Sequence, residues 1–439
     1  MSDGTKARAI PVPAGRINRL ARMGGLTAGV AGRMALGGAQ ALGRGERPDM
    51  RGLLLTPRNI TRVTEQLAQM RGAAMKIGQL VSMDTGDILP PELAQIMARL
   101  RDDAHTMPPA QLKKVLAENW PKGWLGHFET FDVRPIAAAS IGQVHRARTK
   151  DGRDLAVKVQ YPGVADSIDS DVANVGALIR MSGLLPKGFE LAPYLEQARL
   201  QLHEETDYAL EGRHLARFGA LLADDADFVV PEVQADWTTD SILAMSFVHG
   251  TPIEAAADAS QDVRDRIARC LIALTLREVF DWGVMQSDPN FANYRWQADT
   301  GRIVLLDFGA TRDIAPDIAA RYRDLLRAGM EGAMDRAEIA AQDLGLLTPA
   351  VAAEHRARIL RMMAMVFDEL RDHDPFDFAA TDLPRRMQRE GEALARSGFV
   401  PPPVPIDVLY LQRKFAGMFL LASKLRARVD VRGLIAAHL

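Results

Sequence analysis

Three polar residues in the second half of the chain have the types and spacing that phosphate chemistry requires. Asp288 and Asn293 stand five positions apart in QSDPNFAN, and Asp307 follows Asn293 by fourteen positions in LLDFGATR. Carboxylate and amide oxygens hold Mg²⁺ against phosphates, and phosphoryl transfer also needs a carboxylate near the attacking hydroxyl. We therefore interpret Asp288 as the catalytic carboxylate and Asn293 and Asp307 as metal ligands, joined by a predicted hairpin in RWQADTGRIVLL.

A lysine with a possible phosphate role precedes these residues. The stretch LAVKVQYPG at 155–163 alternates apolar and polar residues and places Lys158 in the middle of a predicted strand. A strand lysine most often faces solvent at a sheet edge. The preceding PIAAASIGQVHRAR at 135–148 and the turn DGRD at 151–154 instead predict a hairpin beside this strand. The order of lysine, Asp/Asn pair and Asp-Phe-Gly resembles that of protein kinases, whose strand lysine contacts the α and β phosphates.

The loop before Lys158 differs from a glycine-rich phosphate loop. It has Ala137, Ala138, Ala139 and Ser140, and its glycine is Gly142. Glycine lets backbone amides approach phosphates closely, whereas alanine methyl groups restrict that approach. Alone, an alanine run indicates no more than a packed helix or strand. Together with Lys158, it predicts a modified phosphate loop, with residues 137–140 binding the nucleotide in an unusual way.

Two further segments carry charges on predicted helices. Apolar residues three and four positions apart predict an amphipathic helix over 59–83, with Lys76 and Gln79 on one face. The run ARLQLHEETDYALEGRHLARF at 198–218 predicts a second helix, which carries Glu205, Asp207 and Glu211. Taken alone, charges of this kind most often belong to a solvated helix face.

Five motifs in order make the chain resemble the UbiB family of atypical protein kinase-like proteins, which support ubiquinone (coenzyme Q) biosynthesis. They are KIGQ at 76–79, AAAS at 137–140, ETD at 205–207, QSDPNFANY and LLDFGATR. The similarity runs from about residue 19 almost to the C-terminus. It is closest to the branch with the mitochondrial coenzyme Q kinases, since Gln286 stands where other bacterial members have histidine.

This resemblance implies an α+β, protein-kinase-like bilobal fold with an N-terminal helical extension packed over the active cleft. The Lys76 and Gln79 face would occupy the place where a protein substrate enters, and Glu205 and Asp207 would engage it. These four residues thus join Asp288 as candidate catalytic residues. Glu211 is the preferred partner of Lys158, with Glu205 as the alternative. ATP or ADP and Mg²⁺ are the expected cofactors.

We expect four parts along the chain. These are a basic arm over 1–51, a helical extension over 52–130, a small nucleotide-binding lobe over 131–248 and a helical large lobe over 249–439. The segment SFVHGTPI at 246–253 is the expected hinge between the lobes. By analogy with kinases, adenine would bind to backbone groups of Met245, just before this segment, and of Ser246, Phe247 and Val248 within it.

Composition fits a large protein of a reducing compartment. The chain has 439 residues, 47% of them hydrophobic, and its one cysteine, Cys270, excludes a disulfide framework and a cysteine metal site. Cys270 stands in a helix-like run and is expected to be a core residue. The net charge is −2, yet residues 1–51 carry nine Lys or Arg against three Asp or Glu. No nucleic-acid partner is expected.

The basic arm contains a small-residue segment at 19–42. Arg33 interrupts it, so it is no convincing transmembrane span, and it lacks the hydrophobic core of a signal peptide. Its alternative is a flexible tail. We prefer peripheral membrane contact through the arginines, or a helix dimer through Gly25 and Gly29, which makes a homodimer possible. The expected location is cytoplasmic, at the inner face of the cell membrane, or on the matrix side in a mitochondrion.

Three functions compete at this point. The first is a Mg²⁺-dependent, kinase-like enzyme that hydrolyses ATP or phosphorylates a small or lipid-associated substrate in ubiquinone biosynthesis, with proteins and lipid-soluble intermediates of that pathway as partners. The second is a conventional Ser/Thr protein kinase. The missing Ala-Pro-Glu segment after Asp307 and the covering helix argue against it. The third is a non-catalytic, nucleotide-gated scaffold, which retention of Lys158, Asp288, Asn293 and Asp307 disfavours.

Overall fold

The structure is a computed structural model, and it describes residues 70, 72–74, 76–77, 106–182, 190–399, 402 and 404–439. They form two compact units. The first contains the described residues up to Gly212 together with Glu232–Phe247, and the second contains Arg213–Pro231 and Val248–Leu439.

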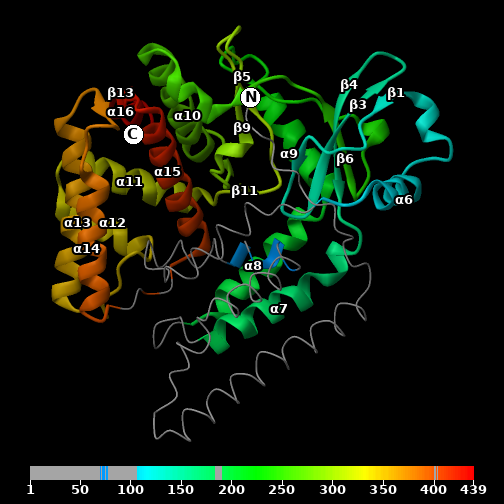
Figure 1. The fold of residues 1–439 in the computed structure, drawn as a ribbon. Helices are drawn as coiled ribbons and strands as arrows, with labels where there is room; N and C mark the ends of the chain where they lie inside the picture. Colours follow the sequence, from blue (N-terminus) through cyan, green and yellow to red (C-terminus); the bar gives the residue numbers. More distant parts are fainter. Residues whose placement is uncertain are drawn as a thin grey trace, which may run out of the picture. The chain divides into compact units, whose positions relative to one another are not determined.

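The first unit is built on a five-stranded sheet in the order β1-β3-β4-β6, with β2 paired to β3 (Figure 1). All of its neighbouring strands are antiparallel. The strands are β1 (Phe128–Phe131), β2 (Ala137–Ala138), β3 (Gly142–Thr149), β4 (Asp154–Gln160) and β6 (Ile242–Ser246). The turn between β3 and β4 needs Gly152, whose φ of 92° lies in the left-handed region.

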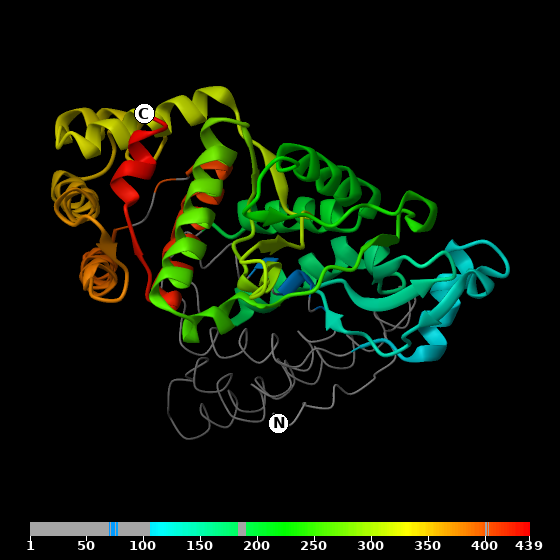
Figure 2. The ribbon, with the colours of Figure 1, turned by 90° about the horizontal axis from the view of Figure 1, so that it is seen from above.

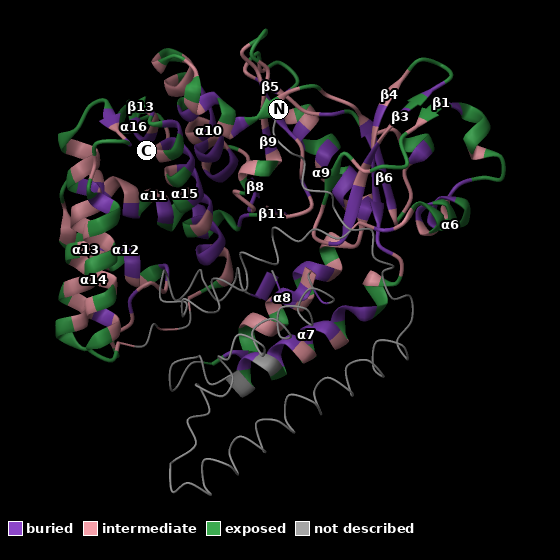
Figure 3. Ribbon diagram, viewed as in Figure 1, coloured by how far each residue is buried: buried purple, intermediate pink, exposed green. Residues whose placement is uncertain are grey.

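The side chains of β4 alternate between a hydrophobic face of this sheet and a polar one. Leu155, Val157 and Val159 belong to a buried cluster, and the residues between them face the opposite side because side chains alternate along a strand. Both β4 and β6 are among the buried parts of the unit (Figure 3). The strand therefore presents Lys158 on the polar face while its neighbours anchor the sheet.

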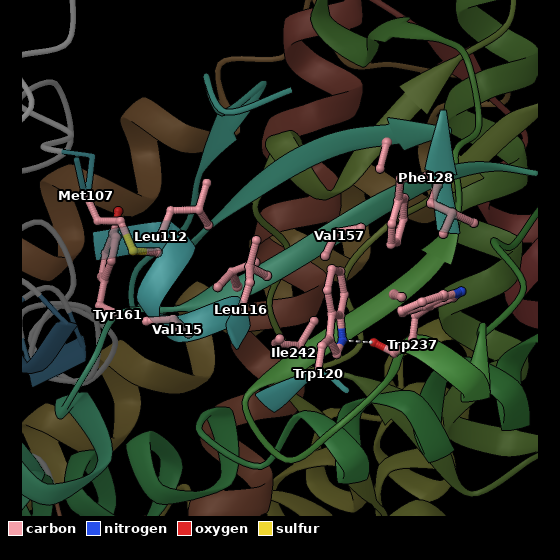
Figure 4. Packing of buried hydrophobic residues seen from close by; sticks show 14 residues of the cluster. Met107, Leu112, Val115, Leu116, Trp120, Phe128, Val157, Tyr161, Trp237 and Ile242 are labelled. Carbon is pink, nitrogen blue, oxygen red and sulfur yellow. Dashed lines mark hydrogen bonds between the residues drawn. The ribbon is translucent and has the colours of Figure 1, made fainter. Parts of the chain in front are cut away.

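Aromatic rings complete the hydrophobic cluster (Figure 4). The Trp120 ring stacks on Phe128 at 5.4 Å between centroids and meets Trp237 edge-on at 5.1 Å. Its indole Nε1 donates a 3.1 Å hydrogen bond to the Trp237 carbonyl. Helix α6 (Pro109–Asn119), which has proline at its start as helices prefer, adds buried Leu112, Val115 and Leu116. Burial of these large apolar side chains fixes the sheet that carries Lys158.

Three more helices follow β4. They are α7 (Val164–Ser182), α8 (Ala192–Glu205) and α9 (Tyr208–Leu221). The prediction of one helix over 198–218 is wrong, because the chain breaks at Thr206 and Asp207. The Asp207 carboxylate accepts a 2.7 Å hydrogen bond from the Leu210 N–H, and the Thr206 hydroxyl donates to the His203 carbonyl at 2.7 Å. Both side chains satisfy backbone groups at helix ends, where such residues are favoured over helix interiors.

The second unit has a four-stranded sheet in the order β5-β10-β9-β7 and a separate pair of strands, β11 and β8. The strands are β5 (Phe228–Val229), β7 (Thr251–Pro252), β8 (Val284–Gln286), β9 (Tyr294–Trp296), β10 (Ile303–Leu305) and β11 (Thr311–Asp313). The antiparallel pairing of β9 with β10 confirms the hairpin predicted after Asn293.

Helices make up the rest of this unit. Helix α10 (Gln261–Phe280) packs along α15 (Ile406–Leu425), and α13 (Ala353–Asp372) lies beside α14 (Leu383–Arg396) (Figure 1, Figure 2). The other helices are α11 (Pro316–Met330), α12 (Met334–Asp343) and α16 (Val431–Ala436), and a small strand pair joins β12 (Phe376–Asp377) to β13 (Arg428–Val429). Among the described helices, none is both long and apolar enough to cross a membrane.

Cys270 lies inside α10, as expected. Its side chain is buried, and its Sγ donates to the Asp227 carboxylate at 3.2 Å. Burial raises the pKa of the thiol to about 11, and the hydrogen bond to Asp227 adds to this effect.

The division into units differs in one respect from the contiguous parts expected from the sequence. The last change of unit falls between Phe247 and Val248, inside the segment 246–253 expected as a hinge. However, Arg213–Pro231 belongs to the second unit, because β5 pairs in parallel with β10, far along the chain. The expected arm over 1–51, with its segment 19–42, lies outside the described residues.

Candidate functional site

Lys158 forms a buried ion pair with Glu211. Its Nζ lies 2.8 Å from both carboxylate oxygens, and the two side chains are 10% and 3% exposed. The Tyr208 ring adds a cation–π contact, with Nζ 5.1 Å from its centroid. The preferred pairing is thus confirmed. The expected role of Lys158 and Glu211 in nucleotide binding stays a prediction.

The alanine loop is a tight hairpin at the start of β3, the strand that pairs with β4. Ala137 pairs with Val144, and Ala138 with Gln143. The Ala139 N–H donates to the Gly142 carbonyl at 2.8 Å, so this amide is used within the hairpin. A Cβ at Gly142 would lie 2.5 Å from the Val159 carbonyl, so β3 approaches β4 closely only without a side chain there.

Glu205 connects this hairpin to the Lys76 segment within the first unit. One carboxylate oxygen binds Nζ of Lys76, and the other accepts a hydrogen bond from the Ser140 hydroxyl at 3.2 Å. Residues 72–74 and 76–77 are helical, which agrees with the predicted helix over 59–83. A Cβ at Gly72 would lie 3.1 Å from the Ile141 side chain, so this segment packs directly on the loop. The predicted contact of Lys76 with Glu205 is confirmed.

Asp207 and Gln79, which the family resemblance groups with Lys76 and Glu205, have different outcomes. Asp207 caps the N-terminus of α9 through Leu210, a structural role that the sequence reading did not assign. Its predicted engagement with Lys76 stays a prediction. Gln79 lies outside the described residues.

The segment expected to bind adenine already uses part of its backbone. The Ser246 N–H donates to the Glu232 carbonyl at 2.8 Å, and the Phe247 N–H donates to the Asp154 carbonyl at 2.8 Å. We therefore restrict the prediction for these two residues to their carbonyl oxygens. Met245 pairs with Ala156 of the neighbouring strand β4, and Ala156 stands two positions before Lys158. Val248 begins the second unit.

In the second unit, two loops bring Asp288, Asn293 and Asp307 together. The loop after β8 holds the first two, and the loop after β10 holds the third. Ser287 donates to the Ala310 carbonyl through its N–H at 2.9 Å and through its hydroxyl at 2.7 Å. The Leu306 N–H donates to the Asn293 carbonyl at 3.0 Å. These bonds fix the two motifs side by side.

The local bonds orient oxygen atoms of Asn293 and Asp307. The Asn293 amide nitrogen donates to the Asp288 carbonyl at 3.3 Å, which directs its Nδ2 toward the backbone. One Asp307 oxygen accepts the Gly309 N–H at 3.0 Å. An amide oxygen and a carboxylate suit Mg²⁺, which commonly takes its remaining ligands from water and phosphates. The described residues contain no cluster of three or more His, Cys, Asp or Glu that could hold a metal by themselves.

A small cavity of about 10 Å³ is lined in part by Asn293 and Asp307. This volume suits about one water molecule. Gln286 also lines the cavity, and the amide oxygen and nitrogen of the Gln286 side chain are buried without a hydrogen-bond partner.

Several residues of this site were not identified from the sequence. Arg413 Nη2 lies 2.7 Å from Oδ1 of Asp288, and Lys414 Nζ donates to the Gln286 carbonyl at 2.8 Å. His214 Nδ1 donates to the Phe308 carbonyl at 3.3 Å, and burial lowers the pKa of this histidine. The signal for the first two was present, since Arg-Lys interrupts the apolar run LYLQRKFAGMFL.

Lys414 also pairs with Glu278, whose Oε2 lies 3.0 Å from its Nζ. Both side chains are almost fully buried. Burial lowers the pKa of Lys414, but attraction to Glu278 and Tyr294 and the hydrogen bonds to both together outweigh it and raise that pKa. Lys414 is therefore a charged donor inside the second unit.

Comparisons with known proteins show which family the chain belongs to. The family model of the ABC1 atypical kinase-like domain matches residues 99–341. The mitochondrial atypical kinase COQ8 of Saccharomyces cerevisiae is 39% identical over 421 residues, which cover 95% of this chain and 83% of that protein. The mitochondrial atypical kinase COQ8B of Rattus norvegicus is 37% identical over 441 residues, covering 99% and 82%.

A solved structure shows a similar fold. The complex of Rv3197 with erythromycin from Mycobacterium tuberculosis aligns with a TM-score of 0.61 and 23% sequence identity. The alignment covers 87% of this chain and 96% of that one. Identity at this level supports the fold alone.

Proposed function

Because the chain belongs to the UbiB family of ABC1 atypical kinase-like proteins, we propose that it binds Mg²⁺-ATP and hydrolyses it or transfers its terminal phosphate. The acceptor would be a small or lipid-associated molecule, and the process served would be ubiquinone biosynthesis. The proposal rests mainly on one observation, the fixing of Asp288, Asn293 and Asp307 side by side by the bonds Ser287–Ala310 and Asn293–Leu306.

Each residue has a role that its surroundings support. Lys158, held by Glu211, would bind phosphate oxygens through its ammonium group. Asn293 and Asp307 would hold Mg²⁺, which neutralises charge on the phosphate oxygens when bound. Asp288 would accept a hydrogen bond from the attacking hydroxyl or water and so orient it.

The alanine loop would complete the nucleotide site as a restricted phosphate loop. Ala137 and Ala138 are exposed, and their strand pairs fully with β3. The Ala139 N–H is already bonded to Gly142, so the loop offers fewer free amides than a glycine-rich loop does. Ser140 bonds Glu205 in this state, and its contact with a nucleotide would require release of that bond.

The Lys76 segment favours a small acceptor over a peptide. It packs on Ile141 and is held by Glu205, so it covers the alanine loop on the first unit. A peptide approaching this loop would have to displace a buried ion pair. This observation disfavours the conventional protein kinase alternative.

Partners and location follow from the family. We expect proteins and lipid-soluble intermediates of ubiquinone biosynthesis as partners. The relatives above are named as mitochondrial, so this chain would act on the matrix side in a mitochondrion, or at the inner face of a cell membrane. Peripheral membrane contact and a homodimer through residues 19–42 remain part of this proposal.

The decisive experiment combines Mg²⁺-ATP turnover with nucleotide binding. Turnover is measured with and without anionic liposomes and lipid-soluble phenols, in the wild type and in Asp307→Asn. Nucleotide at about 100 times its Kd stabilises a protein by about 2.7 kcal/mol, which a thermal shift detects. We expect Mg²⁺-ATP to stabilise the wild type, and Asp307→Asn to lose both the Mg²⁺-dependent shift and the turnover.

A matched control removes a carboxylate that has no assigned role. Asp313 follows on β11 in the same unit, is 77% exposed and pairs with Arg217. Asp313→Asn should keep the nucleotide shift and the turnover. Equal Mg²⁺-ATP shifts in the wild type and Asp307→Asn would overturn the metal assignment, and a wild type that neither binds nor turns over ATP would overturn the function.

A further inference from the structure

One face of helix α15 contacts the loop that carries Asp288. Arg413, Lys414 and Gly417 lie on that face, because residues three and four positions apart are neighbours on a helix surface. Arg413 and Gly417 contact this loop, and Lys414 contacts the end of β8 just before it. The three contacts come from a segment that is more than a hundred positions away along the chain.

Two of the contacts hold the main chain on either side of Asp288. Lys414, buried and charged, donates to the Gln286 carbonyl at 2.8 Å. On the other side, a Cβ at Gly417 would overlap the ring of Pro289, so the missing side chain lets the loop pack directly on α15. The backbone of the loop is thus anchored without Arg413.

The third contact acts on the carboxylate itself. Arg413 Nη2 lies 2.7 Å from Oδ1 of Asp288, and the two side chains are 14% and 22% exposed. Within the described part of the chain, Arg413 is the one side chain bonded to this carboxylate. It binds a single oxygen, which leaves Oδ2 of Asp288 to accept a hydrogen bond from a substrate.

We propose that Arg413 is a positioning residue, which fixes the rotation of the Asp288 carboxylate so that Oδ2 meets the attacking hydroxyl or water. This inference rests on the function proposed above. A guanidinium group is planar and always charged, so it fixes a carboxylate oxygen in one direction better than a lysine ammonium group does. Because Lys414 and Gly417 already secure the loop, loss of Arg413 affects turnover more than stability.

The test compares Arg413→Ala and Arg413→Lys with Arg217→Ala. The control breaks an Arg–Asp pair of the same length, 2.7 Å, between Arg217 and Asp313 in the same unit. Misplacement of a reacting group can cost about 100-fold in rate, so we expect Arg413→Ala to lower kcat by about 10- to 100-fold. The KM for ATP and the nucleotide-dependent thermal shift should stay at the wild-type values. The kcat of Arg413→Lys should lie between that of Arg413→Ala and that of the wild type.

Chemical rescue separates positioning from a purely structural role. Methylguanidinium added at a non-denaturing concentration should restore part of kcat in Arg413→Ala, because it can occupy the vacated space beside Asp288. It should restore nothing in Asp288→Asn, which lacks the carboxylate to be positioned. If Arg413→Ala does not fold, Arg413→Lys carries the test, with kcat below and KM equal to the wild type as the expected result.

Two results would overturn the inference while leaving the proposed function standing. The first is an active wild type with Arg413→Ala indistinguishable in kcat from Arg217→Ala. The second is a loss of kcat in Arg413→Ala that methylguanidinium does not reverse, together with wild-type kcat in Arg413→Lys. A wild type without ATP turnover would instead remove the proposed function, and this inference with it.

Discussion

The Ser140 hydroxyl donates a hydrogen bond to the same Glu205 carboxylate that binds Lys76. The alanine loop and the Lys76 segment therefore both contact the same acidic residue. Glu205 is 17% exposed and Lys76 7%, so the contact between them is largely shielded from solvent. A change in the contact of Glu205 with Lys76 therefore affects its contact with Ser140, and the reverse. This coupling is the physical basis for predictions about opening of the alanine loop.

Replacement of Lys76 by alanine should release the alanine loop. It leaves the Glu205 carboxylate without its cation, and breaking one side of a buried pair costs of order 3 kcal/mol. We expect altered ATP turnover or new autophosphorylation in Lys76→Ala, measured as phosphate incorporated into the protein. The wild type should phosphorylate no generic peptide. Strong wild-type phosphorylation of peptides in trans, unchanged in Lys76→Ala, would refute the covering role and favour a conventional protein kinase.

Removal of Lys158 should destabilise the first unit beyond its effect on nucleotide binding. Lys158→Met leaves Glu211 buried and unpaired, which costs about 3–5 kcal/mol. The double variant Lys158→Met/Glu211→Leu should recover much of this loss, because it removes both charges, yet it should not recover ATP binding. Urea unfolding measures the stability.

An exposed ion pair in the same unit provides the control for this comparison. Arg199 binds Glu196 at 2.7 Å, and the two side chains are 35% and 57% exposed. Arg199→Met should change the free energy of unfolding little, because solvent screens such pairs. If Lys158→Met is no more destabilised than Arg199→Met, the Lys158–Glu211 pair is not a structural support.

Replacement of Ala137 by glycine should change nucleotide handling. The methyl group at this position restricts a strand that is otherwise exposed, and glycine would let the loop approach phosphates more closely. We expect a changed ratio of ATP to ADP affinity or a gain of autophosphorylation, measured by titration with both nucleotides. Ala223→Gly, in an exposed turn after α9, is the control for glycine flexibility itself, which costs about 0.5–1 kcal/mol. Unchanged affinities in Ala137→Gly would make the loop merely structural.

The stability of the first unit should depend on pH through His145. Its Nδ1 donates to the Asp132 carbonyl at 2.7 Å, and Nε2 accepts from Gln143 at 2.8 Å, so the ring is neutral and both nitrogens are used. Burial lowers the pKa of His145 below 6.5, although the backbone hydrogen bond with Asp132 opposes this effect. The unfolded chain therefore binds the proton more readily than the folded one does.

Protonation of His145 links the stability of the first unit to pH. The contribution of His145 is fully present above the unfolded pKa of 6.5 and is lost as the pH falls below it. Urea unfolding of the wild type and of His145→Gln across this range measures it. We expect the wild type to lose more stability than the variant on acidification. Parallel pH profiles for the two proteins would contradict this assignment.

The parts of the site that the sequence predicts are those governed by local pattern. Alternation in LAVKVQ places Lys158 inside a strand, and the spacing from Asp288 to Asp307 leaves room for one hairpin. The break at Asp207 also had a local signal, since Thr-Asp before an apolar run is typical of a helix start. The run 198–218 as a whole nevertheless has the composition of a single helix.

The parts that the sequence does not predict depend on packing between distant segments. Arg413 lies 125 positions from Asp288, and the packing of α15 against α10, which in turn contacts β8, brings them together. Likewise, β5 joins the second unit through its pairing with β10. Neither contact has a spacing rule, because tertiary burial and not local propensity determines them.

The single thiol of this chain also makes the protein convenient for spectroscopy. Cys270 is buried, its pKa is raised to about 11, and only a thiolate reacts readily with maleimide reagents. A cysteine placed at exposed Ala138 would therefore take up a fluorophore or spin label selectively, without first removing the native one. Such a label would report movements of the alanine loop on nucleotide addition in real time, independently of any turnover.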